Sequence, residues 1–396
     1  MLRVLTLSTL FPDATRPNFG VFVERQTLGL AALPDTEVHV VAPVGLPPFP
    51  LSRHRSYRER IALPRHETWK GLSVERPRFL NIPATSGRFH AAMLMRALVP
   101  VLTCIRRDFA FDVIDASFFF PDGPAAVALG KRFGVPVSIK ARGADIHHWG
   151  TATATRAAVR NAGRQADGLL AVSAAMRDDM IALGIPGGRI AVHHTGVDQE
   201  RFRPDPAAKA ALGFEGPLVV SVGALIPRKG HEIAIGAVAR LPGVSLQIAG
   251  EGPERARLEA LIATLGVGDR IRLLGPVRHD ALPPLLAAAD VMALASSSEG
   301  LANAWVEALA SGTPIVIPDA GGAREVVDRP AAGRIVERTA DAFASAIDEL
   351  SRVPPAREAV RATAAKFTWE RNAETLRAHL AALVEKKKRD PGSNPG

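Results

Sequence analysis

The sequence has a single cysteine among its 396 residues, and this scarcity limits the chemistry that the chain can perform. One thiol cannot form an internal disulfide or a cysteine-cluster metal site, so we expect Cys104 to be a small buried hydrophobic side chain. No apolar run reaches the roughly 20 residues needed to cross a bilayer. The opening MLRVLTLSTLF has one arginine and no small-residue cleavage pattern, so it predicts a first buried strand and not a signal peptide. These absences fit a cytoplasmic protein.

Aromatic side chains are also scarce, at 5% of the chain, although the net charge is +9. Stacking on bases needs aromatic residues and no nucleic-acid-binding motif is present, so we expect no nucleic-acid partner. The basic residues are dense between positions 52 and 66, in SRHRSYRERIALPRH. This stretch is either a solvated loop or a contact with an anionic membrane or lipid-linked substrate, since each basic residue gains about 1 kcal/mol near such a surface. Peripheral contact at the inner face of a membrane is therefore the expected refinement of a cytoplasmic location.

Length and periodicity predict an α/β protein with two domains, each with its own core. Short apolar runs alternate with helical segments in both halves, which is typical of a parallel sheet covered on both faces. A proline-rich polar segment precedes a new strand series and predicts a linker. The expected divisions are a first domain at 1–198, a linker at 199–215, a second domain at 216–368, a helix at 369–390 that crosses back to the first domain, and a disordered tail at 391–396.

Local signals mark the ends of several predicted helices. Asp122 and Pro124 signal a helix start, and Ser173 is a good N-cap for a later helix. The segment 89–107 has helical spacing, but Pro100 is expected to kink or split it.

The stretch SSSEGLANAWVEALASGTPIVIPDAGG, residues 296–322, predicts a loop, a helix, a strand and a second loop. Glu299 stands before the helix and Glu307 lies one turn inside it. The first free amides of the helix and its dipole attract an anion, and Gly300 lets a ligand approach the backbone. A carboxylate accepts two hydroxyl donors in parallel, so the pair favours a sugar joined to a phosphate. The alternative is a solvent-facing helix stabilised by an N-terminal glutamate alone.

The loop GALIPRKG, residues 223–230, places Arg228 and Lys229 side by side after a predicted strand. A forked guanidinium and a point-like ammonium at this position suit a diphosphate, although a surface cation pair has the same sequence. The segment IAGEGPER looks like a dinucleotide fingerprint, but Arg255 stands where glycine or alanine is required and Glu251 would repel a pyrophosphate. We therefore reject it as a nicotinamide site.

The first half offers weaker candidates. Gly20 follows the first strand and either lets backbone amides approach a ligand or serves an ordinary turn. Arg142 and Asp145 lie at the carboxyl end of another predicted strand, the edge at which open α/β sheets bind ligands. His147 and His148 are adjacent and cannot both face one metal from one strand, so no metal site is expected.

Taken together, these motifs resemble glycosyltransferase family 4, the retaining group 1 transferases with the GT-B fold of two Rossmann-like parallel-sheet domains facing a central cleft. Many members carry His-Gly where this chain has Arg142 and Gly143, which is similar to a subset that makes exported polysaccharide. The resemblance spans nearly the whole chain and rests on TGVDQERFRP at 195–204, GALIPRKG at 223–230, GEGPE at 250–254, LGPV at 274–277, EGLANAWVEALASGTPIV at 299–316 and GGAREVV at 321–327.

The resemblance implies a nucleotide-diphosphate sugar held mainly by the second domain, with the acceptor against the first. Arg228 and Lys229 would neutralise the leaving diphosphate. Glu307 would accept the ribose hydroxyls and Glu299 those of the transferred sugar. The remaining donor contacts would come from Gly20, Gly223, Leu274, Gly300, Leu301, Ala302 and Asn303.

The resemblance also places Arg142 and Asp145 at the reaction centre, with retention of the anomeric configuration. No metal or other cofactor is expected, because two cations and a helix start can stabilise the leaving group. The acceptor would be lipid-linked or a saccharide, in the synthesis of cell envelope or extracellular polysaccharide. Two alternatives remain: a catalytically degenerate scaffold that binds nucleotide-sugar, which Arg142 favours, and a nicotinamide oxidoreductase, which the rejected fingerprint weakens.

Overall fold

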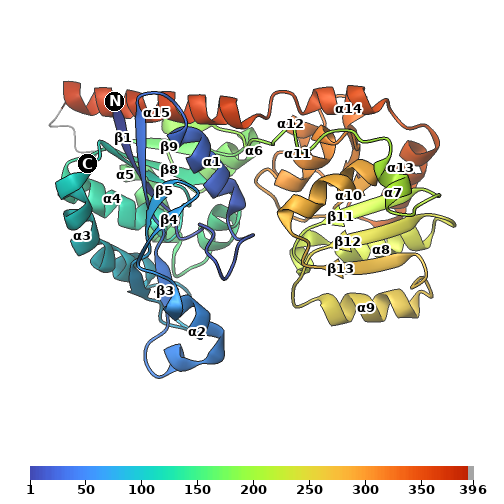
Figure 1. Cartoon of the computed structure of the whole chain (residues 1–396), viewed down its shortest axis with the longest axis horizontal. Coiled ribbons are helices and arrows are strands. Elements are labelled where there is room, and N and C mark those ends of the chain that lie inside the picture. The colour runs from blue at the N-terminus through green and yellow to red at the C-terminus, as the bar shows by residue number, and fades with distance from the viewer. Residues whose placement is uncertain (391–396) are drawn as a thin grey trace. The chain divides into compact units, whose positions relative to one another are not determined.

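The computed structural model describes residues 1–390, apart from the side chain of residue 56, and the tail expected at 391–396 lies outside the described residues. The chain divides into two compact units. The first comprises Met1–His194 and the segment that begins at Trp369, and the second comprises Thr195–Thr368. Each unit is built of a sheet flanked by helices (Figure 1).

The first unit contains an eight-stranded sheet in the order β10-β9-β8-β7-β1-β2-β5-β4. All neighbours pair in parallel except β4 and β5. The central strands β7 and β8 are buried along their whole length, as expected for a parallel sheet covered on both faces. The strands are β1 (Leu2–Leu7), β2 (Thr36–Val41), β4 (His66–Trp69), β5 (Leu72–Glu75), β7 (Val113–Ala116), β8 (Val137–Ala141), β9 (Gly168–Ala171) and β10 (Ile190–Val192), beside a separate parallel pair, β3 (Val44–Leu46) and β6 (Arg78–Leu80).

The C-terminal helix α15 (Trp369–Arg389) completes the core of this unit. Its Leu376, Leu380 and Val384 are buried in one cluster with Leu2 and Val4 of β1. This burial explains why a segment so distant in sequence packs on the first strand. The other helices of the unit are α1 (Val21–Ala31), α2 (Arg55–Ala62), α3 (His90–Asp108), α4 (Asp122–Phe133), α5 (Arg156–Gln165) and α6 (Ala174–Ala182), with short helical turns at Leu51–Arg53, Asp145–Trp149 and Gly187–Arg189.

The second unit contains a six-stranded parallel sheet in the order β13-β12-β11-β14-β15-β16. The strands run β11 (Leu218–Val222), β12 (Ser245–Ala249), β13 (Ile271–Gly275), β14 (Val291–Ala293), β15 (Ile315–Ile317) and β16 (Gly333–Ile335). The strand order reverses between β11 and β14, so this sheet has a topological switch point there. Its helices are α7 (Ala208–Ala211), α8 (His231–Ala239), α9 (Arg255–Thr264), α10 (Leu282–Ala288), α11 (Asn303–Ala310), α12 (Ala323–Val326), α13 (Ala340–Arg352) and α14 (Arg357–Thr363), with short turns at Pro227–Lys229 (η4), His279–Ala281 (η5) and Pro330–Ala332.

Four local expectations from the sequence can be compared with the structure: the burial of Cys104 is wrong, the two helix-start signals are confirmed, and splitting of a helix at Pro100 is excluded. Cys104 is exposed on α3, because it lies on the solvent side of a helix whose buried stripe is leucine and isoleucine. Helix α4 begins at Asp122, as predicted, and the Asp122 carboxylate accepts from the Thr9 amide of another loop. Pro100 does not split α3, which runs unbroken over 19 residues. Ser173 does cap α6, where its hydroxyl accepts from the Met176 amide.

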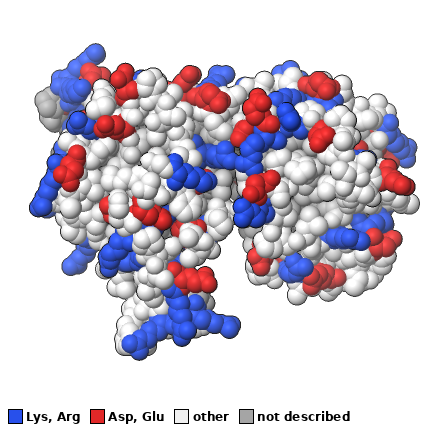
Figure 2. All heavy atoms as spheres, in the orientation of Figure 1, with Lys and Arg blue, Asp and Glu red and all other residues white. Residues whose placement is uncertain are grey.

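A projecting segment of the first unit, residues 47–62, contains most of the arginine-rich stretch 52–66. We call it the arm. Figure 1 shows α2 standing away from the sheet, and Figure 2 shows Lys and Arg gathered on this projection. Three apolar side chains on it are exposed: Phe49 at 70%, Leu51 at 54% and Ile61 at 45%. Within residues 1–390, no helix is both long enough and apolar enough to cross a bilayer.

Candidate active site

The strongest cluster of predicted residues lies at the switch point of the second unit. Strands β11 and β14 are neighbours in the sheet, so the loops that follow them emerge side by side. The first loop carries η4 with Arg228 and Lys229, and the second carries Glu299. Lys229 Nζ donates to Glu299 Oε1 at 2.5 Å, and Arg228 Nη1 lies 3.4 Å from the same oxygen. The structure therefore brings these three predicted residues together.

The electrostatics of this trio keep Glu299 ionised. Burial alone would raise the pKa of its carboxyl, but the Lys229 and Arg228 cations lower it below its usual value. One carboxylate therefore faces two cations, and the three groups together carry a net positive charge. Lys229 is 14% exposed and Arg228 is 39% exposed, so both cations can still reach a ligand. A diphosphate approaching this edge would share them with Glu299.

The backbone around the trio is fixed by close approaches that need glycine. A Cβ on Gly230 would stand 2.3 Å from the backbone oxygen of Ala295, and one on Gly321 would stand 2.1 Å from the backbone oxygen of Glu299. Gly223 packs against the Lys229 stem, where a Cβ would meet Cδ at 3.3 Å. Gly300 contributes through its backbone, because its carbonyl accepts from the Gly322 amide at 2.8 Å. The loop after β15 thus covers the loop that carries Glu299.

Helix α11 starts directly after these loops. Ala302 is its N-cap residue and Asn303 its first residue, so the helix begins between Glu299 and Glu307 as predicted. Leu301 and Ala302 are both buried. The Asn303 side chain accepts from the Thr195 hydroxyl at 2.8 Å, which anchors the first turn of the helix. Leu274, predicted to meet the base, lies on the edge strand β13 with 42% of its surface exposed.

Glu307 has a partner that the sequence did not reveal. His279 Nε2 lies 2.8 Å from Glu307 Oε1 and donates to it, because a carboxylate only accepts. His279 begins η5, in the connection between β13 and α10. The two residues are 28 positions apart, with a helix and a strand between them, so no local spacing connected them. The only available signal was that His279 lies five residues after Leu274.

The remaining predicted residues, Gly20, Arg142 and Asp145, belong to the first unit. Gly20 precedes α1 with φ at 76°, and a Cβ there would stand 2.3 Å from the Leu10 oxygen. The left-handed backbone and this close approach demand glycine for the turn itself. The ordinary turn explains this residue without a ligand.

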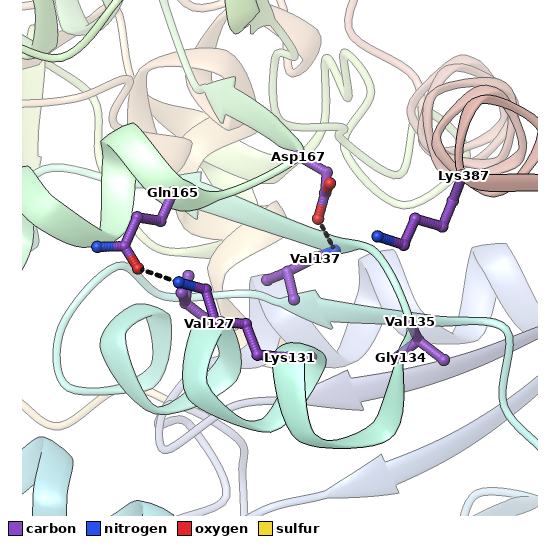
Figure 3. Close-up of a pocket in the computed structure, with 9 residues that line it drawn as sticks. Val127, Lys131, Gly134, Val135, Val137, Gln165, Asp167 and Lys387 are labelled. Atoms are coloured by element: carbon purple, nitrogen blue, oxygen red, sulfur yellow. Dashed lines mark hydrogen bonds between the residues drawn. The ribbon is translucent and has the colours of Figure 1, made fainter. Parts of the chain in front are cut away.

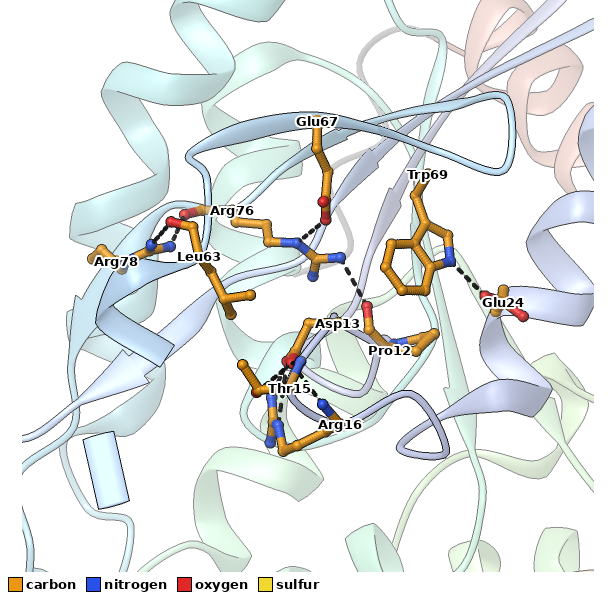
Figure 4. A network of polar contacts seen from close by, with 10 residues as sticks. All are labelled: Pro12, Asp13, Thr15, Arg16, Glu24, Leu63, Glu67, Trp69, Arg76 and Arg78. Carbon is orange, nitrogen blue, oxygen red and sulfur yellow. Dashed lines mark hydrogen bonds and ion pairs between the residues drawn. The ribbon is translucent and has the colours of Figure 1, made fainter. Parts of the chain in front are cut away.

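The loop that leads to Gly20 is held by a buried arginine (Figure 4). Arg76 is 1% exposed and donates to Glu67 Oε1 at 2.5 Å and to the Pro12 oxygen at 2.8 Å. Asp13 closes the next turn by accepting from Thr15 and Arg16. These charge-assisted bonds fix the connection between β1 and α1.

Arg142 follows β8, and its guanidinium contacts three residues of the first unit. Its Nε donates to the Ser117 oxygen at 2.6 Å, and its Nη2 donates to Gln26 Oε1 at 3.1 Å. Its guanidinium lies 4.8 Å from the centre of the Phe22 ring, on the same face of α1 as Gln26. Asp145 accepts from the backbone amides of Phe119, Arg142 and Gly143, so it shapes the turn that carries Arg142.

Behind Arg142 lies a fully buried lysine that was not predicted. Lys140 Nζ donates to Gln26 Oε1 at 2.9 Å and to His193 Nδ1 at 2.6 Å. Burial, then the Arg142 charge, lowers the pKa of Lys140 well below its usual value, while Asp115 opposes the shift. Burial likewise raises the pKa of Asp115 to about 6. No group of three or more histidine, cysteine or acidic side chains within residues 1–390 is arranged to hold a metal ion.

A small pocket of about 50 Å³ also occurs in the first unit (Figure 3). Lys131 Nζ donates to Gln165 Oε1 beside it, and Asp167 accepts from the Val137 amide. Val137 begins β8 whereas Arg142 follows its end, so the pocket lies at the opposite edge of the sheet from Arg142. It forms no part of the candidate site.

Two family models match this chain, one in each half. The model for Glycosyl transferases group 1 matches residues 205–367, and the model for Glycosyltransferase Family 4 matches residues 20–201. The GDP-mannose-dependent alpha-(1-6)-phosphatidylinositol monomannoside mannosyltransferase of Mycobacterium tuberculosis is 33% identical over 60% of this chain and 66% of its own length. The D-inositol 3-phosphate glycosyltransferase of Mycobacterium bovis is 37% identical over 51% of this chain and 45% of its own. The chain thus spans less than two thirds of either relative.

Solved structures show the same fold. Sucrose-phosphate synthase from Thermosynechococcus elongatus superposes with a TM-score of 0.82 at 20% identity, over 98% of this chain and 100% of that one. Anabaena HepE in complex with UDP and glucose superposes with a TM-score of 0.75 at 20% identity, over 96% and 100%. The two family models together with this fold leave one assignment: the chain belongs to the group 1 glycosyltransferases, family 4, and has the GT-B fold.

Proposed function

We propose that this protein transfers a sugar from a nucleotide-diphosphate sugar to a lipid-linked or saccharide acceptor. The observation that carries the proposal is the contact of Arg228 and Lys229 with one carboxylate, Glu299, at the switch point of the second sheet. Open α/β sheets bind ligands at this point, and paired cations beside a helix start suit a diphosphate. Family membership supports the same activity.

The chemistry follows from the charges at this edge. In the transfer, the bond between the anomeric carbon and the β-phosphate oxygen breaks, and a bond to the acceptor oxygen forms. The acceptor proton goes to the departing phosphate oxygen on the same face, which gives retention. The leaving group is a nucleoside diphosphate, whose growing negative charge Arg228, Lys229 and the first amides of α11 stabilise. These groups make a metal unnecessary in this proposal.

In this proposal each part of the donor has its own residue. Glu299 accepts the hydroxyls of the transferred sugar, Glu307 accepts those of the ribose, and Leu274 meets the base. The relatives named above supply two candidates for the nucleotide, since one is named for GDP-mannose and HepE was solved with UDP. Arg142 stands where an acceptor-side group is expected, and its contacts with Ser117 and Gln26 hold its guanidinium in one orientation.

We further propose that the arm brings the protein to an anionic membrane surface. Phe49, Leu51 and Ile61 offer exposed apolar area, and the arginines between them offer positive charge. Interfacial segments combine these two features, because apolar burial and attraction to anionic lipid add. Such contact suits a lipid-linked acceptor and a role in cell-envelope or extracellular polysaccharide synthesis.

The test is a panel of UDP-, GDP- and ADP-sugars scored by thermal unfolding and then by transfer or hydrolysis. A stabilising nucleotide-sugar that is also consumed supports the proposal. Arg228→Ala with Lys229→Ala should weaken nucleoside diphosphate binding at least about hundredfold, because two charged contacts are lost. The matched control is Arg324→Ala with Lys366→Ala, which removes the same charge from exposed ion pairs in the same unit. Equal affinity in the active-site double variant refutes the diphosphate site.

Glu299→Gln separates the role of this cluster in diphosphate binding from its role in sugar transfer. Removing the carboxylate charge frees two cations, so diphosphate affinity should hold or rise while turnover falls about hundredfold. A degenerate scaffold, the second candidate function, would bind the nucleotide-sugar in wild type and variant alike and consume it in neither. The fixed contacts of Arg142 are the feature that favours it. Measured transfer by the wild type excludes it.

A further inference from the structure

The pair formed by His279 and Glu307 is more buried than an ordinary surface ion pair. Exposed ion pairs contribute about 0–1 kcal/mol to stability and often nothing, so they do little to fix the position of either side chain. Here the Glu307 side chain is 11% exposed and that of His279 is 25% exposed. Glu307 Oε1 accepts from His279, whereas Oε2 accepts no hydrogen bond from the described residues. The carboxylate is therefore oriented through one oxygen and keeps the other for a ligand.

The imidazole is itself held from behind. The Phe202 ring meets the His279 ring edge-on, with centroids 5.5 Å apart, and Phe202 is 1% exposed. Arg201 Nη2 donates to the His279 carbonyl at 3.4 Å. Arg361 in turn donates to the Phe202 carbonyl at 3.0 Å. A buried aromatic residue and two arginines thus fix the position from which His279 reaches Glu307.

His279 also joins the two parts of the site that face a nucleoside. It begins η5, which follows the loop after β13, and Leu274 lies near the end of β13. Glu307 lies on α11, whose first residue follows the loop of Glu299. The imidazole therefore connects the edge proposed for the base to the carboxylate proposed for the ribose. The cations of η4 make their contacts elsewhere, since both Arg228 and Lys229 pair with Glu299.

We propose that His279 is the positioning residue for the nucleoside half of the donor: its Nε2–H holds the Glu307 carboxylate so that Oε2 receives the ribose hydroxyls. This inference rests on the proposed function. It predicts that His279 governs the preference for ribose over deoxyribose and leaves pyrophosphate binding untouched. A residue with a merely structural role would change both together.

Two amide variants separate the roles of the imidazole nitrogens. The shorter side chain of His279→Asn carries its amide only as far as the Nδ1 position, so this variant loses the Nε2 donor. His279→Gln carries its amide to the Nε2 position and restores the donor. Each is measured with UDP, GDP and ADP, with their 2′-deoxy forms, and with inorganic pyrophosphate, by calorimetry on the full chain. The matched control is His66→Gln, because His66 pairs with Glu75 through Nδ1 at 2.9 Å in the first unit and the longer glutamine carries its amide past that position.

The wild type should prefer the ribonucleotide to its 2′-deoxy form by about tenfold, the ratio for one hydrogen bond to a charged group. His279→Asn should reduce this preference to about threefold or less, with pyrophosphate affinity unchanged, and His279→Gln should restore it. Glu307→Gln should remove the preference so that adding His279→Asn changes nothing further. An unchanged preference in His279→Asn, or a parallel loss of pyrophosphate, overturns the inference while nucleotide binding by the wild type sustains the proposed function. A wild type that binds none of the three nucleotides overturns both.

Discussion

Asp122 is a buried acid whose ionisation should oppose folding. It is fully buried at the start of α4, its Oδ2 accepts from the Thr9 amide at 2.9 Å, and its Oδ1 has no partner among the described residues. Burial, with the nearby Asp145 charge, raises the pKa of Asp122 from 3.8 to about 7, against the Thr9 hydrogen bonds. The native state therefore binds this proton more tightly than the unfolded chain. Its contribution is neutral below about pH 4 and becomes destabilising as the pH rises through 7.

The size of the effect follows from the shift. About three pKa units at 1.36 kcal/mol per unit correspond to about 4 kcal/mol between pH 4 and 8. Asp122→Asn removes the titration and keeps an acceptor for Thr9. Its new amide hydrogens lack a partner where Oδ1 stands, which costs about 1–3 kcal/mol at every pH. We therefore expect the difference in unfolding free energy, variant minus wild type, to rise by about 4 kcal/mol over this range, whatever its offset.

Hydrogen exchange followed by mass spectrometry suits this test, because peptides from β1 and α4 report the unit that contains Asp122. His379, whose pKa burial lowers to about 4, destabilises the native state below pH 6.5 in both proteins and cancels in the difference. Asp178→Asn is the control, since Asp178 is exposed in the same unit. Parallel stability curves for Asp122→Asn and wild type would refute the reasoning.

Two further predictions concern the first unit. Gly20→Ala should lower the free energy of unfolding by more than Gly134→Ala, since both place alanine at positive φ, costing about 1–2 kcal/mol, but only Gly20 also meets a backbone oxygen at 2.3 Å. Equal melting temperatures for these two variants would contradict this. Replacing an arm arginine, Arg53 or Arg58, with glutamine should reduce binding to anionic vesicles about fivefold each, and Phe49→Ser should reduce it further, whereas Leu265→Ser on the second unit should not. Sedimentation with vesicles of about 30% anionic lipid measures this, and binding unaffected by all three arm variants would exclude the arm as the contact.

The contact of Arg228 and Lys229 with Glu299 was predictable because it depends on sheet topology. Adjacent parallel strands end at the same edge, so loops 70 residues apart in sequence become neighbours once β11 pairs with β14. The same reasoning placed Arg142 and Asp145 at the other sheet's carboxyl edge. Gly250 of IAGEGPER has a packing role: a Cβ there would lie 1.8 Å from the Gly223 backbone oxygen, so this position needs glycine for the close approach of two loops.

The side-chain partners were not predictable. His279 meets Glu307 only because η5 and the first turns of α11 face each other, and Lys140 meets Gln26 and His193 across 114 and 53 residues. A lysine in a strand also contradicts the expectation that charged side chains avoid the core. The prediction that Cys104 is buried was wrong. Small apolar residues lie on either face of a helix, and the register of α3 places Cys104 on the exposed face.

The basic side chains of the two units differ in burial. Those of the second unit remain accessible to a ligand, whereas those of the first are enclosed by protein partners. In the second unit, Arg228 and Lys229 are partly exposed and share one carboxylate, so the proposed diphosphate would compete with Glu299 for these two cations. In the first, Lys140 is fully buried and donates to Gln26 and His193, and His193 donates onward to the Asn372 carbonyl of α15. A polar group buried in this way is stable only while its partners stay in place, because an unpaired member costs several kcal/mol. Gln26 Oε1 accepts from both Lys140 and Arg142, so the guanidinium at the sheet edge is anchored by the same amide oxygen as the buried lysine behind it.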